Sequence, residues 1–353
     1  MSDINLLSPG RIGGLELSNR IIMSPMTRSR ALAGGVPSEL AIEYYVQRAS
    51  AGLIITEGTS PSAVGLGYAR SPAIETPEQI AAWKKITTAV HARGGRMFCQ
   101  FMHVGRIGHD DNRYTKEPLV APSAIKAAGT IWTDSKGLQE YPVPRALETR
   151  EIPAVIEEFA QATRNALAAG FDGVELHAAS GYLPMQFLSS NSNQRTDQYG
   201  GSVNNRIRFV IEALEAMIKA AGSASKVGIK IAPGMPFNDI QDADPKETYT
   251  TLVKALAPLG LGYLHVLRTV IPETFDMLRP LYKGTFIVCG AFTQETGNAA
   301  LQSGLADFIV YGKLFTSNPD LPARFAKGAE LVPWDTTTFY SPGPKGYTDF
   351  ASL

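Results

Sequence analysis

Short apolar segments alternate with amphipathic segments eight times along this 353-residue chain. The apolar segments have the length and period of strands, and the amphipathic segments have helical spacing. The expected strands are residues 20–26, 52–59, 96–103, 173–177, 226–233, 263–268, 285–290 and 308–312. The expected helices are residues 38–50, 76–93, 152–169, 202–221, 245–259, 273–283, 294–303 and 318–326. Eight alternating units of this kind close a parallel barrel, so we predict an α/β fold, a (β/α)8 TIM barrel.

Two segments lie outside this repeat. Residues 6–17 contain Pro-Gly and Gly-Gly pairs, which predict a short hairpin at the floor of the barrel. Residues 105–148 are rich in Pro and Gly and follow the third strand, so we expect a lid-like excursion over the barrel mouth. No linker divides the chain, which predicts a single domain over residues 1–353.

Composition excludes several classes of partner. The 33 basic residues balance the 33 acidic ones, so no electrostatic footprint for nucleic acid or anionic lipid is present. Cys99 and Cys289 lie in apolar strand-like runs and are expected to be buried, unreactive thiols. The chain shows no signal peptide and no apolar run of roughly 20 residues, so we expect a cytoplasmic protein without a membrane anchor.

Polar residues gather where the fourth strand ends. Val174 and Leu176 alternate with Glu175 and His177, and Ser180 and Tyr182 follow before a long polar loop over residues 189–202. Hydrogen-bonding groups at a strand end, followed by a loop too long for connection alone, indicate a pocket. The alternative is a capped strand with a hydrophilic loop.

Barrel enzymes carry their chemistry at the carboxyl ends of the strands. The residues expected there are Thr27, Gly58, Gln100, His103, His177 and Lys230. Alternation predicts that Phe98, Gln100 and Met102 share the inner face, and that Lys230 points inward as well. A buried Lys requires an anion or an acceptor, so Lys230 indicates a ligand; an internal salt bridge is the alternative.

The last two strands end in small residues, Gly290 and Ala291 after the seventh, and Gly312 with Lys313 after the eighth. Loops at these positions commonly bind phosphate in such barrels, although Gly also serves tight turns. The five histidines show no paired ligand spacing, so no metal site is expected and a metal-dependent hydrolase is disfavoured.

The chain resembles the old yellow enzyme family of FMN-dependent ene-reductases nearly end to end. The matching segments are residues 19–29, 52–59, 195–202, 205–209, 317–322, 338–340 and 346–349, and Gln100 with residues 103–106. Several such matches in order across eight barrel units are highly specific. The resemblance implies tightly but noncovalently bound FMN, NADPH or NADH as reductant, a small-molecule substrate, and a monomer or homodimer.

The resemblance also implies roles for individual residues. Pro25, Met26 and Thr27 would lie against the flavin ring, Gly58 and Gln100 at its pyrimidine edge, and Lys230 beside N1. The phosphate would be held by Gly290, Ala291, Gly312 and Lys313. His177 and Ser180 would bind the carbonyl or nitro oxygen of an activated alkene, and His177 would also contact the flavin. Tyr182 would protonate the α-carbon after hydride transfer from flavin N5, with Met102, Phe237 and Tyr340 lining the substrate site.

The sequence departs from the family pattern at four of these positions. Ser180 stands where Asn or a second His is usual, and Met102 where Trp is common. Lys230 and Lys313 replace Arg, which keeps the charge but loses the bidentate geometry. A flavin-dependent isomerase or desaturase acting on a specialised metabolite is therefore an alternative.

Two further alternatives use the same barrel differently. A Schiff-base aldolase would use Lys230 as its nucleophile, but this hypothesis leaves Gln100 and residues 195–202 unexplained. A flavin-binding sensor without catalytic turnover is the other, and alkene-dependent oxidation of NAD(P)H would exclude it.

Overall fold

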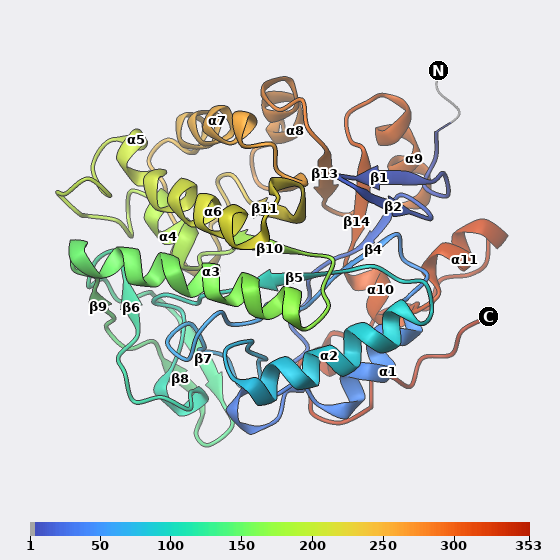
Figure 1. The fold of residues 1–353 in the computed structure, drawn as a ribbon, viewed down its shortest axis with the longest axis horizontal. Coiled ribbons are helices and arrows are strands. Elements are labelled where there is room, and N and C mark those ends of the chain that lie inside the picture. Colours follow the sequence, from blue (N-terminus) through green and yellow to red (C-terminus); the bar gives the residue numbers. More distant parts are fainter. Residues whose placement is uncertain (1–3) are drawn as a thin grey trace.

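Eight parallel strands close into a barrel in the computed structural model, which describes residues 4–353 (Figure 1). The strands are β3 (Ile21–Met23), β4 (Leu53–Ile55), β5 (Met97–Phe101), β10 (Gly173–Ala178), β11 (Val227–Ile231), β12 (Tyr263–Leu267), β13 (Phe286–Cys289) and β14 (Phe308–Tyr311). Each strand pairs with the next along the chain, and β14 pairs with β3 to complete the ring. The predicted TIM barrel is confirmed.

Alternation along the strands separates the two faces as expected. Val227, Ile229 and Ile231 belong to the large core between the strands and the surrounding helices. Phe98 and Tyr263 belong to a second core, inside the barrel. Residues of β10 and β11 are buried on both faces, which is typical of parallel strands covered by helices.

Helices surround the barrel, but their bounds differ from the prediction in two regions. The helices are α1 (Glu39–Gln47), α2 (Pro77–His91), α3 (Ile152–Ala168), α4 (Leu183–Leu188), α5 (Val203–Arg206), α6 (Arg208–Ala221), α7 (Pro245–Leu256), α8 (Thr274–Leu278), α9 (Gln294–Gln302), α10 (Lys313–Ser317) and α11 (Leu321–Lys327). The predicted last helix, residues 318–326, begins only at Leu321, because Asn318 precedes Pro319 and takes a non-helical backbone, and the unpredicted helix α10 comes before it. A short helix that the sequence did not predict, α4, lies between β10 and the predicted polar loop of residues 189–202, and its six residues are all buried.

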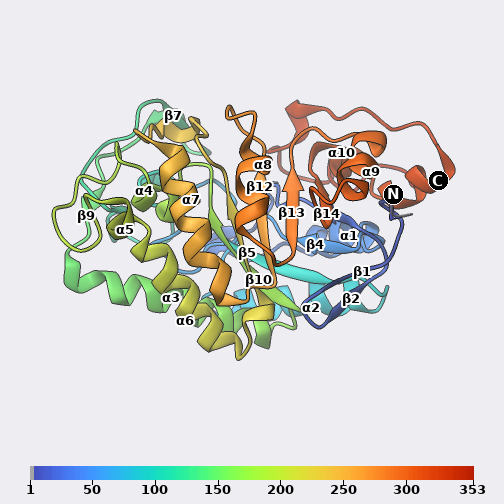
Figure 2. The ribbon, with the colours of Figure 1, turned by 90° about the horizontal axis from the view of Figure 1, so that it is seen from above.

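The N-terminal hairpin consists of β1 (Gly10–Ile12) and β2 (Leu15–Leu17), paired antiparallel. Ile12 and Leu17 pack with the inner core of the barrel. Figure 2 shows this hairpin at the end of the barrel opposite β7 (Thr130–Thr133), which lies on the side toward which β13 points. The hairpin therefore covers the amino ends of the strands.

The excursion over residues 105–148 contains β6 (Val120–Ala121), β7, β8 (Gly137–Glu140) and β9 (Arg145–Ala146). β7 and β8 form an antiparallel hairpin, and β6 pairs with β9. The excursion contacts the loop after β11, since the N–H of Ala128 donates to the carboxylate of Asp239. It thus lies at the carboxyl ends of the strands, and its opening as a lid stays a prediction. Within residues 4–353, no helix has the length and apolar character required to cross a bilayer.

Candidate active site

Polar side chains meet inside the carboxyl end of the barrel, contributed by neighbouring strands. His177 on β10 is in register with Lys230 on β11, which is in register with His265 on β12. Gln100 on β5 is in register with Glu175 on β10. All five residues are buried. Such a concentration of buried polar groups at one end of a barrel marks a ligand site.

His177 and Tyr182 lie against each other at the strand end. Their rings are 4.9 Å apart between centroids and nearly perpendicular. The Nδ1 atom of His177 is buried without a hydrogen-bond partner among residues 4–353. Burial, aided by the charge of Lys230, holds the pKa of His177 well below its usual value. The imidazole is therefore neutral, with one N–H to donate.

The hydroxyl of Tyr182 lies 3.3 Å from the hydroxyl of Tyr68, in the loop after β4. Burial raises the pKa of Tyr182 to about 12, although the hydrogen bond to Tyr68 acts in the opposite direction. The sequence did not single out Tyr68. Its only local signal was its position in a Gly-rich segment after the second barrel strand.

Ser180 has a left-handed backbone, with φ of 56°. Among residues with a side chain, Asn, Asp and His adopt this conformation most readily. Its hydroxyl contacts the sulfur of Met235 at 3.9 Å, and its carbonyl accepts from the side chain of Asn238 at 2.8 Å. The hydroxyl is thus held only by a weak acceptor.

Lys230 is 6% exposed and makes no ion pair or hydrogen bond with any residue of the described range 4–353. The nearby carboxylate of Glu175 is instead bonded to Gln100 and His265. The alternative of an internal salt bridge for Lys230 is therefore wrong. A buried cation without a protein counter-charge requires an anionic or strongly accepting ligand.

Small residues bring backbone close to this end of the barrel. A Cβ at Gly58 would lie 2.6 Å from the sulfur of Met102, so no side chain fits there. Gly312 approaches Met26 in the same way, at 3.2 Å, which places the turn after β3 beside the turn after β14. Pro25, Met26 and Thr27 in that first turn are partly exposed.

Gly290 and Ala291 both have positive φ, 145° and 55°. Consecutive residues of this kind turn backbone N–H groups toward one side, which suits an anion. Lys313 is exposed and begins α10, and its ammonium lies over the ring of Trp334 at 5.8 Å from the centroid. The structure thus directs the charge of Lys313 to an aromatic face.

Two exposed aromatic residues lie at the rim. Phe237, 51% exposed, follows β11 in a turn whose Asn238 contacts Gly181. Tyr340, 57% exposed, lies on the C-terminal segment and accepts a hydrogen bond at its carbonyl from Arg70. Tyr340 lies close enough to Tyr182 to contribute, after burial, to the raised pKa of that residue.

Two expectations about this region are wrong. His103 does not face the mouth: its Nε2 lies 3.8 Å from Glu158 of α3, because residue 103 has the opposite parity to Gln100 and Met102. Cys289 is partly exposed at the end of β13, whereas Cys99 is buried as expected.

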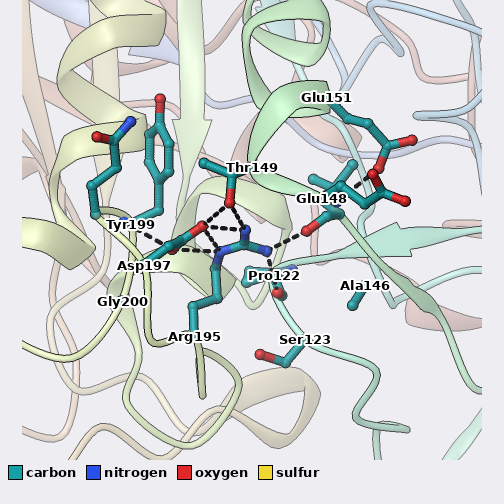
Figure 3. Close-up of polar contacts among 12 residues, drawn as sticks. Pro122, Ser123, Ala146, Glu148, Thr149, Glu151, Arg195, Asp197, Tyr199 and Gly200 are labelled. Carbon is teal, nitrogen blue, oxygen red and sulfur yellow. Dashed lines mark hydrogen bonds and ion pairs between the residues drawn. The ribbon is translucent and has the colours of Figure 1, made fainter.

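The polar loop over residues 189–202 fastens the excursion. Arg195 donates to the carbonyl of Pro122, which directly follows β6 (Figure 3), and to that of Leu147, which directly follows β9. The guanidinium is also paired with Asp197, which lowers the pKa of that carboxyl to about 2. The loop is therefore a clamp that holds residues 105–148 in place.

FMN fits the residues at this end of the barrel. Lys230 provides an unpaired positive charge, Gly58 permits close approach, and Gly290 and Ala291 provide N–H groups for a phosphate. A metal ion has no counterpart here, since no cluster of three His, Cys, Asp or Glu side chains occurs in the part of the chain that the structure describes.

Comparisons with known proteins agree with this geometry. The sequence model of the NADH:flavin oxidoreductase / NADH oxidase family matches residues 5–331. The chain is 41% identical to 12-oxophytodienoate reductase 1 of Oryza sativa subsp. japonica, over 99% of this chain and 93% of the relative. It is 38% identical to 12-oxophytodienoate reductase 2 of Arabidopsis thaliana, over 99% and 96%.

Solved structures extend this similarity to the fold. Morphinone reductase superposes with a TM-score of 0.95 at 41% identity, covering 100% of this chain and 97% of that one. The old yellow enzyme homologue of Zymomonas mobilis superposes with a TM-score of 0.96 at 39% identity, covering 99% and 100%. The chain therefore belongs to the NADH:flavin oxidoreductase / NADH oxidase family, that of the old yellow enzymes, and is an FMN-dependent NAD(P)H oxidoreductase of the ene-reductase type.

Proposed function

We propose that the protein reduces the C=C bond of an α,β-unsaturated carbonyl compound or a nitroalkene, with Tyr182 as the proton donor. The observation that carries this proposal is the contact between Tyr182 and the neutral His177, at the strand end that also holds the unpaired Lys230. This places an acid, an oxygen-binding donor and a cation at one site.

The cofactor half of the site is supplied by six segments of the chain. When bound, FMN accepts hydride from NAD(P)H and delivers hydride to the alkene. Lys230 stabilises the negative charge that accumulates near N1 on reduction. Gln100 and Gly58 hold the pyrimidine edge, and residues 25–27 lie against the ring. Gly290, Ala291, Gly312 and Lys313 hold the phosphate.

The substrate half uses His177, Ser180 and Tyr182. His177 donates a hydrogen bond to the carbonyl or nitro oxygen, where negative charge grows in the transition state. Tyr182 would give its proton to the α-carbon of the alkene. Its raised pKa keeps the phenol protonated at neutral pH. Met102, Phe237 and Tyr340 line or cover the remaining space.

Anaerobic turnover tests this proposal. The purified protein should be yellow, release FMN on denaturation, and oxidise NADPH or NADH only when an enone, nitroalkene or maleimide is added. The product should be the saturated compound. Flavin release without alkene-dependent turnover would instead identify a binding protein, and borohydride trapping of a substrate on Lys230 would identify a Schiff-base enzyme.

Ser180 supports a second candidate, an isomerase or desaturase acting on a specialised metabolite. Its short side chain binds a weak acceptor, so the substrate oxygen receives less stabilisation than an amide would provide. Product analysis without NAD(P)H separates the two functions. Cytoplasmic location and a monomeric or homodimeric state stay predictions.

A further inference from the structure

Glu175 forms a hydrogen-bonded triad with two residues inside the barrel. Its Oε1 atom is 2.6 Å from Nε2 of Gln100, and its Oε2 atom is 2.9 Å from Nδ1 of His265. Glu175 and His265 are fully buried, and Gln100 is 1% exposed. The three residues come from β10, β12 and β5, so the barrel itself assembles the triad.

The chemistry of a carboxylate determines the orientation of both partners. An ionised carboxylate only accepts hydrogen bonds, so both Gln100 and His265 must donate to it. One N–H of the Gln100 –NH2 group is thereby committed to Glu175, which fixes the orientation of the amide. Its amide oxygen accepts no hydrogen bond from any residue between 4 and 353 and is free for a ligand.

His265 supports the same arrangement from the other side. With Nδ1–H donating to Glu175, the Nε2 atom carries a lone pair, and it is buried without a partner among the described residues. Burial lowers the pKa of His265, against the opposing charge of Glu175, and Lys230 lowers it further. The imidazole is neutral, so the charge of the carboxylate is not neutralised by its histidine.

We propose that Glu175 is a positioning residue that holds the Gln100 amide with its oxygen toward the flavin, so that the site selects the N3–H donor of the pyrimidine edge. This inference rests on the proposed location of FMN beside Gln100. Glu175 does not touch the flavin in this account and acts through Gln100. This role of Glu175 would explain why a carboxylate is buried beside a site that binds an anionic cofactor.

A neutral amide at position 175 removes this constraint. Glutamine can donate or accept, so in Glu175→Gln the Gln100 amide can turn and present its –NH2 group instead. In the turned amide, the –NH2 group of Gln100 would face the N3–H group of the flavin, and two donors cannot form a hydrogen bond with each other. One lost or opposed hydrogen bond of this kind changes affinity by roughly 10- to 100-fold.

Binding of FMN and of N3-methyl-FMN to the apoprotein tests the proposal. In the wild type, we expect N3-methylation to weaken binding by roughly 10- to 100-fold, because the accepting oxygen of Gln100 meets a methyl group. In Glu175→Gln, this ratio should fall by about tenfold. In Gln100→Ala, the ratio of the two affinities should fall by the same factor. The double variant Glu175→Gln/Gln100→Ala should show no further fall, because Glu175 acts through Gln100.

Tyr249→Phe is the matched control. Tyr249 lies on α7 in the core outside the barrel strands, is 1% exposed, and its hydroxyl has no hydrogen-bond partner among the described residues. We expect it to retain the wild-type ratio. An unchanged ratio in Glu175→Gln, or an equal fall in Tyr249→Phe, would overturn the proposal.

A measurement on the wild type covers the case in which Glu175→Gln does not fold. The N3–H proton of ¹⁵N-labelled FMN in the holoenzyme should be shifted downfield and protected from exchange with water. Rapid exchange would overturn the inference while FMN binding stands. Failure of the apoprotein to bind FMN at all would contradict the proposed function itself.

Discussion

The hydroxyl groups of Tyr182 and Tyr68 lie 3.3 Å apart, and both rings are packed among aromatic residues at the barrel mouth. The two residues are 114 positions apart in the chain. Tyr68 is thus positioned to support the proposed proton donor when it loses its proton. This pair connects the proposed chemistry with several measurable quantities.

Removing the proposed acid should affect one half of the reaction. In Tyr182→Phe, we expect alkene reduction to slow by roughly 10²- to 10⁴-fold, because the α-carbon loses its proton donor. Reduction of the flavin by NAD(P)H should change little. Stopped-flow measurement of each half-reaction separates the two. Equal slowing of both would show that Tyr182 is not the donor.

Loss of the Tyr68 hydroxyl should weaken Tyr182 as an acid. The hydrogen bond between the two hydroxyls lowers the pKa of Tyr182, so Tyr68→Phe should raise this pKa further. We expect alkene reduction to slow by about tenfold, the effect of one hydrogen bond. In the wild type the rate should stay level from pH 6 to about pH 10, because the phenol loses its proton only near pH 12. A rate unchanged by Tyr68→Phe would contradict this role.

A longer donor at position 180 should strengthen binding of enolate mimics. The left-handed backbone of Ser180 accommodates Asn, so Ser180→Asn introduces no new strain. We expect phenolic ligands to bind about tenfold more tightly, measured by the charge-transfer absorbance of the flavin. Ser180→Ala is the control and should bind them no better than the wild type. If both variants behave alike, residue 180 does not face the ligand.

The clamp on the excursion should be needed for its stability. Arg195→Ala removes the hydrogen bonds to Pro122 and Leu147 and leaves Asp197 unpaired. We expect a loss of about 2–3 kcal/mol of unfolding free energy and faster proteolysis within residues 105–148. Arg150→Ala, with a side chain 84% exposed, should have little effect. Similar cleavage in both variants would exclude the clamp.

A buried carboxyl should make stability depend on pH. Burial raises the pKa of Glu57 to about 7 from 4.5, against the opposing effects of Arg28 and Arg30. Since the folded-state pKa lies above the unfolded value, the stabilisation is complete below pH 4.5 and is lost as the pH rises through 7. Each pKa unit corresponds to about 1.4 kcal/mol.

Thermal unfolding between pH 4.5 and 8 checks this contribution. The curve of Tm against pH should be flatter for Glu57→Gln than for the wild type. Glu16→Gln, whose side chain is 75% exposed, should follow the wild type. Parallel curves for Glu57→Gln and the wild type would mean that Glu57 does not titrate in this range.

Much of the fold follows from local patterns in the sequence. The parity of Phe98 and Gln100, or of Val227 and Lys230, is visible as period-two alternation, and both pairs face as predicted. The same alternation places His103 on the outer face of the barrel, toward α3, so the expectation that it lies at the barrel mouth was inconsistent with this pattern. The predicted start of the last helix at residue 318 was wrong, although Pro319 already disfavours a helical backbone at Asn318.

Other features had no local signal. Arg195 lies in a motif that resembles part of a pocket, and only its contacts with Pro122 and Leu147 show that it holds the excursion. The helix α4 had no clear signal in the sequence. Its six residues are all buried, so they show no amphipathic period, and a polar loop follows them directly.

The sequence alone determined the eightfold barrel and the polar residue types at its carboxyl end, because alternation and turn chemistry depend on neighbours in the chain. Tertiary structure alone decided which polar groups meet. Tyr68 reaches Tyr182 and Glu175 reaches His265 only because strand register and the loop paths at the barrel mouth bring distant segments together. Hydrogen bonds require contact within about 3 Å, and no local pattern encodes that distance across a barrel.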